Sequence, residues 1–96
     1  MAEKKNMRYF RALDTPGLVR VLFDLKYDRN YYTGKLAKAG WNNQNLMNKG
    51  MPVWRHVRSN KRNIAQVMTI LKERGIKVED ESKEELLARI TVIKNG

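Results

Sequence analysis

The most regular pattern in the chain is a run of apolar residues that follows the period of an α-helix. The residues that recur at i, i+3, i+4 and i+7 are Ile64, Val67, Met68 and Leu71. This spacing places their side chains on one helical face. Asn60 is a candidate N-cap, and Gly75 stands where a helix end tolerates a left-handed residue. The pattern predicts a helix over residues 61–74.

Two further helices are expected in the first half of the chain. Asp14 followed by Pro16 is typical of a helix start, and the apolar residues after it favour a helix over residues 16–26. The polar residues 27–30 mark its expected end. A second, shorter helix is expected over residues 33–39, with Gly40 as its stop signal.

The C-terminal part alternates apolar and polar residues, which is typical of strands. Residues 76–78 and 89–94 show this alternation on either side of the acidic segment 79–85. The pattern predicts a C-terminal β-hairpin. Ser82 and Glu85 also match a capping box, so a helical turn across Leu86 and Leu87 is the alternative.

The segment between the second and third expected helices is hard to interpret. A short helix at residues 44–49 fits the sequence. Pro52 could start another turn, or residues 53–57 could alternate on a strand. The periodicity does not decide between these.

Charge is distributed very unevenly along the 96 residues. The formal net charge is +10, and residues 29–72 contain no carboxylate at all. The cations of this block are Arg29, Lys35, Lys38, Lys49, Arg55, Arg58, Lys61, Arg62 and Lys72. Charge segregated in this way attracts a polyanion, and nucleic acid is the first candidate.

Composition narrows the class of protein. The length suits one domain over residues 1–96, with residues 1–7 expected to be disordered. No apolar run is long enough to suggest a signal peptide or a membrane span, so we expect a cytoplasmic protein with no membrane partner. With no cysteine, one isolated histidine (His56) and no phosphate-binding glycine loop, we expect no catalysis, no cofactor and no metal site.

Three segments resemble the winged helix-turn-helix superfamily of small transcriptional regulators. Residues 9–16 are similar to the lead into the first helix, residues 32–38 to the second helix, and residues 64–78 to the recognition helix and first wing strand. The resemblance implies a mainly α fold with a C-terminal β-hairpin (α+β). About twenty residues separate the second and third helices, which implies an insertion there or a recognition helix that starts near Asn42.

The charge and the resemblance together favour a double-stranded DNA-binding protein, a transcriptional regulator. The 61–74 helix would lie in the major groove, with Arg62 and Gln66 toward the bases and Thr69 on the same exposed face. The cations expected to hold phosphates are Lys35, Lys38, Lys49, Arg55, Arg58 and Lys61.

Two alternatives remain open from the residues alone. The first is RNA binding, in which bases stack on the aromatic residues of the basic block, Tyr31, Tyr32, Trp41 and Trp54. The second is a protein-binding adaptor with an anchor patch formed by Trp41, Met47, Met51 and Trp54. We expect Tyr9 and Phe10 to be exposed, which leaves room for a homodimer.

Overall fold

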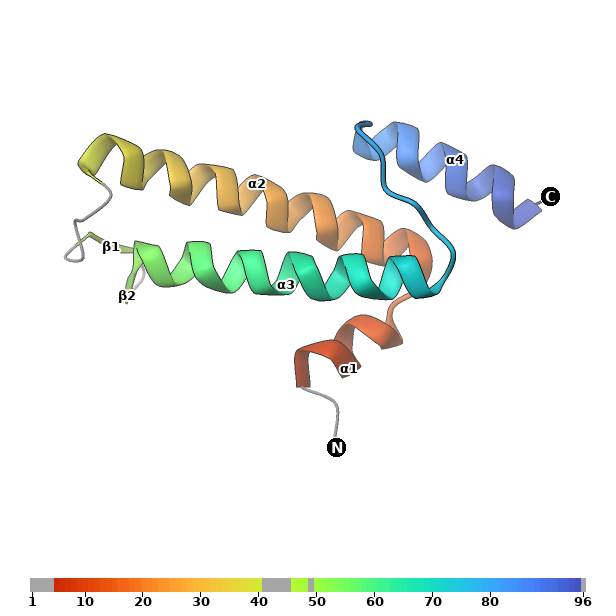
Figure 1. Ribbon diagram of the computed structural model, residues 1–96, viewed down its shortest axis with the longest axis horizontal. Helices are drawn as coiled ribbons and strands as arrows, with labels where there is room; N and C mark the ends of the chain where they lie inside the picture. The colour runs from red at the N-terminus through yellow and green to blue at the C-terminus, as the bar shows by residue number, and fades with distance from the viewer. Residues whose placement is uncertain (1–4, 41–45, 49, 96) are drawn as a thin grey trace.

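The protein is a helical hairpin with a shorter helix packed on either side of one end (Figure 1). A computed structural model describes residues 5–40, 46–48 and 50–95. Its elements are α1 (Lys5–Ala12), α2 (Thr15–Ala39), β1 (Met47–Asn48), β2 (Met51–Pro52), α3 (Val53–Glu73) and α4 (Lys83–Asn95). The long helices α2 and α3 run antiparallel, side by side, and form the body of the molecule.

Helix α2 begins and ends at the predicted signals but is not interrupted between them. The Gly17 N–H donates to Asp14 Oδ1 (2.8 Å), Pro16 lies in the first turn, and Gly40 ends the helix with φ 93°. The prediction of two separate helices, over residues 16–26 and 33–39, is therefore wrong. Residues 27–30 contain neither proline nor glycine, so nothing in the backbone stops the helix there.

Helix α3 starts earlier than predicted. Its first residue is Val53, directly after Pro52, and Asn60 is an interior residue rather than an N-cap. Of the alternatives for residues 53–57, the helix is the one observed. The C-terminal end agrees with the prediction, because the helix ends at Glu73 and Gly75 has φ 79°. The expected helix at residues 44–49 lies partly outside the described residues, and Met47–Asn48 is strand β1.

The predicted C-terminal β-hairpin is wrong. The residues expected to form its second strand belong to helix α4, and those between α3 and α4 form neither helix nor strand. The capping box is confirmed, but the helix that follows it has 13 residues rather than the single turn expected across Leu86 and Leu87. The Glu85 N–H donates to Ser82 Oγ (3.1 Å), and the Ser82 N–H donates to Glu85 Oε1 (3.2 Å). This reciprocal pair satisfies backbone donors at the start of α4, which a strand would not require.

The winged helix-turn-helix architecture is corrected together with the hairpin. No wing follows α3, and the strands in the described residues are the two-residue pair β1 and β2 at the opposite end of the molecule. Gly50, with φ 78°, lies in the turn between them. The expected second helix is the end of α2, and part of the expected insertion is the start of α3. The fold is an α-helical hairpin, not an α+β domain.

The apolar interior consists of two clusters at different ends of the hairpin. The main core gathers buried residues of all four helices and Ile76: Phe10, Leu18, Val19, Leu22, Ile64, Val67, Ile70, Leu71, Ile76, Leu86 and Ile90. The second cluster, which we call the tip core, consists of Leu36, Val53 and Val57. Tyr32, Leu46 and Trp54 pack against it. The tip of the hairpin is thus held by far less apolar burial than its base.

Short polar contacts attach the N-terminal helix to α3. Asn6 donates to Asn63 (3.1 Å), Arg11 forms an ion pair with Glu73, and the Arg74 guanidinium donates to the Arg11 carbonyl oxygen (3.1 Å). Residues 5–7, expected to be disordered, are helical here, while residues 1–4 lie outside the described residues. None of the described helices has the length and apolar character needed to cross a membrane.

Candidate nucleic-acid interface

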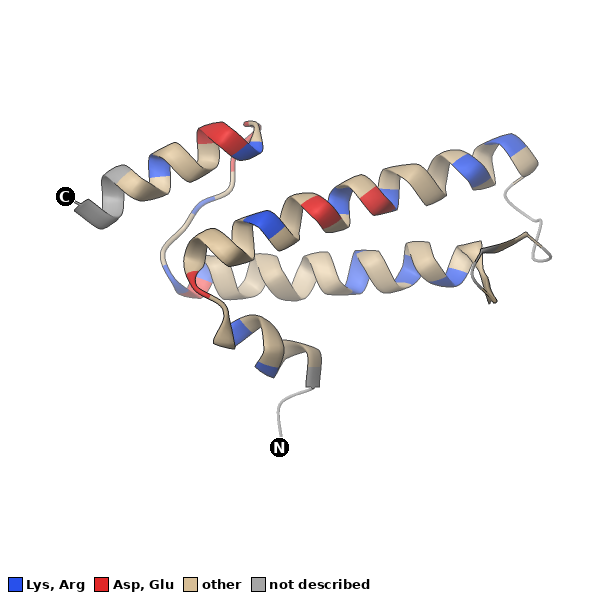
Figure 2. Ribbon diagram, turned by 180° about the vertical axis from the view of Figure 1, so that it is seen from behind, with Lys and Arg blue, Asp and Glu red and all other residues tan. Residues whose placement is uncertain are grey.

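Positive and negative side chains separate along the hairpin. Figure 2 shows cations along α3 and at the far end of α2, with acids in the middle of α2 and at the start of α4. The acid-free sequence block forms the second half of α2, the β1–β2 pair and nearly all of α3. The charge segregation seen in the sequence therefore becomes a spatial one, with the tip of the hairpin as the electropositive end.

The densest group of cations lies on the outer face of α3. Arg55, Arg58 and Arg62 are all exposed, and their spacing of three and four residues places them on one side of the helix. We call these three residues the arginine stripe. Their α-carbons rise by roughly 4.5 and 6 Å along the axis, as three and four helical residues require. The buried Val53 and Val57 hold the opposite side of the helix against the tip core.

A solvent-open hollow of about 440 Å³ lies at the arginine stripe. Its lining is Met51, Trp54, Arg55, Arg58, Ser59 and Arg62. The Arg55 guanidinium carbon lies 5.4 Å from the centre of the Trp54 ring, within the range of a cation–π contact. The hollow thus combines an aromatic surface, three guanidinium groups and a hydroxyl, a set that suits a planar anionic ligand.

Trp54 contacts both the tip core and the hollow. It is half-buried and packs against the cluster of Leu36, Val53 and Val57 while also lining the hollow. Tyr32 and His56 stack beside this cluster, with ring centres 4.6 Å apart and planes 13° apart, and join α2 to α3. Of the aromatic residues in the basic block, Tyr32 packs between α2 and α3, Tyr31 is half-exposed, and Trp54 also borders the cationic hollow, while Trp41 lies outside the described residues.

Two predicted phosphate contacts lie away from the arginine stripe. Lys38 comes two positions after Leu36, which faces α3, so Lys38 lies on the far side of α2. The Lys35 ammonium sits over the half-exposed Tyr31 ring, 4.8 Å from its centre. These lysines share the tip with the stripe but not its face. Lys49, also predicted, lies outside the described residues.

The remaining predicted residues lie along α3 with different accessibility. Lys61 is exposed beside Arg62, and Thr69 is exposed with its hydroxyl donating to the Ala65 carbonyl oxygen (2.9 Å). Gln66 is only half-exposed, and its side-chain oxygen is buried without a hydrogen-bond partner among the described residues. It occupies the α3 surface between Asn63 and Glu73, both of which contact α1. In this structure Gln66 is therefore poorly placed to read bases.

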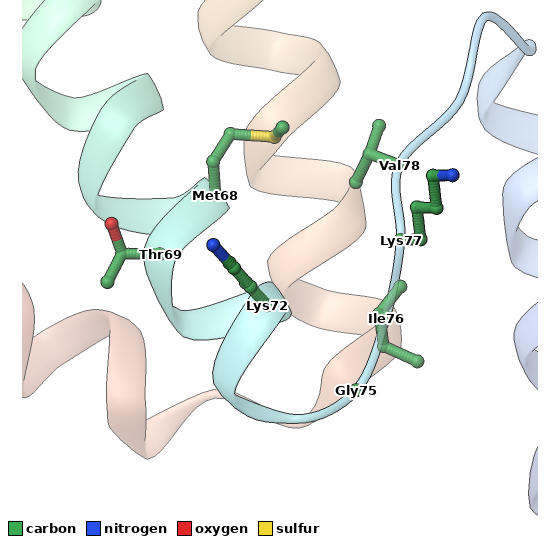
Figure 3. A pocket seen from close by; sticks show the side chains of 7 residues that line it. All are labelled: Met68, Thr69, Lys72, Gly75, Ile76, Lys77 and Val78. Carbon is green, nitrogen blue, oxygen red and sulfur yellow. The ribbon is translucent and has the colours of Figure 1, made fainter.

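A second hollow, of about 600 Å³, lies beside the end of α3 (Figure 3). Met68, Ile76 and Val78 are the apolar side chains of its lining. The Lys77 ammonium points away from Met68, while Lys72 rises on the other side (Figure 3). The two cations do not converge, so this hollow has no evident anion site. No three potential metal-ligating side chains lie together in residues 5–40, 46–48 and 50–95.

Comparison with protein-family models, curated proteins and solved structures finds no match. The function must therefore be argued from the site itself. Sequence reasoning named the three arginines of the stripe but missed Ser59, which lines the same hollow. Ser59 lies four residues after Arg55 and three before Arg62, a spacing that places all three on one helical face. This spacing becomes informative once α3 is known to begin at Val53.

Proposed function

We propose that the protein binds double-stranded DNA through the outer face of α3. The observation that carries this proposal is the arginine stripe: three exposed guanidinium groups on one helical face, with no carboxylate in residues 29–72. Duplex DNA carries a high density of phosphate charge, and arginine forms paired hydrogen bonds to phosphate oxygens. The proposed role is binding rather than catalysis.

The shape of the molecule supports a groove-binding mode. The major groove of B-form DNA admits one α-helix. Contacts of α1 with α3 lie at Asn63, Glu73 and Arg74, so the first half of α3 has α2 behind it and an open outer face. Arg55 and Arg58 would then contact the backbone, and Arg62 would lie nearest to the bases. The proposal keeps the role expected from the sequence, which is that of a transcriptional regulator in the cytoplasm.

The test is a comparison of two triple variants with equal loss of charge. Arg55→Gln/Arg58→Gln/Arg62→Gln removes the stripe and keeps good helix formers. The control Arg8→Gln/Arg20→Gln/Lys77→Gln removes three exposed cations elsewhere. Fluorescence anisotropy with labelled duplex DNA over a range of salt concentrations gives the affinity and its salt dependence.

The stripe variant should bind duplex DNA more weakly, and its log–log salt slope should be shallower by about 1.8, from about 0.9 for each of the two phosphate contacts made by Arg55 and Arg58. The control should keep most of the slope. Equal behaviour of the two variants would show that net charge alone drives binding. An RNA duplex should bind less tightly than the DNA duplex, because its narrow major groove excludes a helix. Tighter binding of the RNA duplex would indicate that RNA, not DNA, is the ligand.

A further inference from the structure

We propose that the hollow beside Trp54 binds one unpaired nucleotide, so that the preferred ligand is duplex DNA with a single-stranded extension. This inference rests on the proposed function and adds a ligand preference to it. The three features that carry it are the indole of Trp54, the guanidinium over that ring and the open volume in front of them.

Trp54 is built as a platform for stacking. Its packing against the tip core restricts the ring, which lowers the entropic cost of ordering the side chain when a base stacks on it. In the free protein the Arg55 guanidinium, a planar cation, lies over the ring. A base can take that place, since bases stack on tryptophan and on arginine alike. The displaced guanidinium of Arg55 then becomes available to the phosphate of the same nucleotide.

The rest of the lining matches the other parts of a nucleotide. Arg58 and Arg62 border the hollow, and Arg58 can bind a phosphate next to the stacked base while Arg62 faces the bases. The Ser59 hydroxyl can donate to or accept from a base edge or a sugar. The volume of about 440 Å³ lies within the range of pockets that take small molecules.

The ligand must expose the face of a base. Within a duplex both faces of each base are covered by its neighbours, so Trp54 cannot stack on an internal base pair. A single-stranded extension offers such a face next to the duplex that the arginine stripe binds. The two sites overlap, because Arg55, Arg58 and Arg62 form the arginine stripe and also line the hollow. One molecule of DNA can therefore occupy the stripe and the hollow together.

The experiment compares three DNA probes with the same duplex part: a blunt duplex, a duplex with a thymine extension, and a duplex with an abasic extension of equal length. The last two carry the same phosphates and differ only in the bases. Trp41→Phe serves as the background, so that Trp54 is the fluorescent reporter. We expect the thymine extension to bind about tenfold more tightly than the abasic one and to quench the Trp54 emission.

Trp54→Leu should make the affinities for the two extended probes equal, and Trp54→Phe should restore part of the preference for the thymine extension. Equal affinity of the Trp41→Phe protein for both extended probes, without quenching, would overturn the inference and leave duplex binding intact. Failure of all three probes to show salt-dependent binding would instead overturn the proposed function. The Trp41→Phe protein keeps Trp54, so its affinities for the two extended probes test the inference even if replacing Trp54 loosens the tip.

Discussion

The two apolar clusters predict that the tip and the base of the hairpin respond differently to the same mutation. Leu22 and Leu36 both lie on α2 and are buried, with 0% and 4% of their surface exposed. Leu22 belongs to the main core, and Leu36 is one of three buried residues of the tip core. Leu→Ala at a buried site costs about 2–5 kcal/mol. The chemical change is the same in both variants, so differences must come from the surroundings.

The apolar burial of each cluster indicates which part of the molecule each substitution will destabilise. Three buried side chains at about 1.5–3 kcal/mol each give the tip core roughly 5–9 kcal/mol of apolar burial, before the entropy of ordering is subtracted. Losing Leu36 removes about a third of this, so the tip should open locally. Losing Leu22 weakens the cluster that joins all four helices, and this should lower the global melting temperature by about 10 °C or more.

Amide hydrogen exchange and thermal denaturation together test this. Leu36→Ala should accelerate exchange in the first two turns of α3 by about 30-fold or more, equivalent to at least about 2 kcal/mol, with little change at Ile64 to Leu71. Leu22→Ala should accelerate exchange in both regions. If Leu36→Ala lowered the melting temperature as much as Leu22→Ala, with uniform acceleration, the two clusters would form one cooperative unit and the reasoning would fail.

Two further predictions concern polar side chains. The buried side-chain nitrogen of Asn60 makes no hydrogen bond within the described residues, and such a group costs about 1–3 kcal/mol of stability. Asn60→Leu should therefore raise the melting temperature. An unchanged or lower melting temperature would indicate that this nitrogen has a partner. The hydrogen bond from Arg11, with its charge, holds the pKa of Glu73 below the ordinary value of 4.5, so the pair stabilises the fold above that pH and loses its effect as the pH falls through the lowered pKa. The melting temperatures of the natural chain and Glu73→Gln should therefore converge on acidification from neutral pH, and a constant difference would contradict this.

Local signals in the sequence predicted the start of α2 and the C-terminal ends of α2 and α3, but not the start of α3. Asp14 caps α2 through its own side chain, and Gly40 and Gly75 follow helices with positive φ. These features depend on a few neighbouring residues, and the sequence displays them directly. The continuity of α2 was harder to predict because its middle is polar. Half-buried Arg29 keeps the helical spacing between Leu25 and Tyr32, and this register becomes meaningful only with α3 alongside.

The errors at the C-terminus arose from a pattern with two interpretations. Short alternating segments fit a strand, but a strand needs a partner, and the sequence does not show whether one exists. In the structure, Arg89 instead donates to the Lys77 carbonyl oxygen and forms an ion pair with Glu81 at 2.5 Å, which holds the connecting segment to α4. The candidate site was also only partly predictable from the sequence. The arginines could be named individually, but their common face required knowing where α3 begins.

The electrostatics of the tip connect its weak packing with its proposed ligand. Like charges about 6 Å apart in water repel by about 0.7 kcal/mol, and no carboxylate within residues 29–72 offsets the repulsion along the arginine stripe. The repulsion acts within α3, at the end of the hairpin where apolar burial is smallest, so it lowers the stability of the free tip. A bound polyanion makes the net electrostatic energy of the stripe favourable, because each phosphate that pairs with a guanidinium removes repulsion as well as adding attraction. A ligand that binds only the ordered tip also stabilises it by mass action. The same residues that weaken the free tip are therefore those that make its binding to DNA favourable.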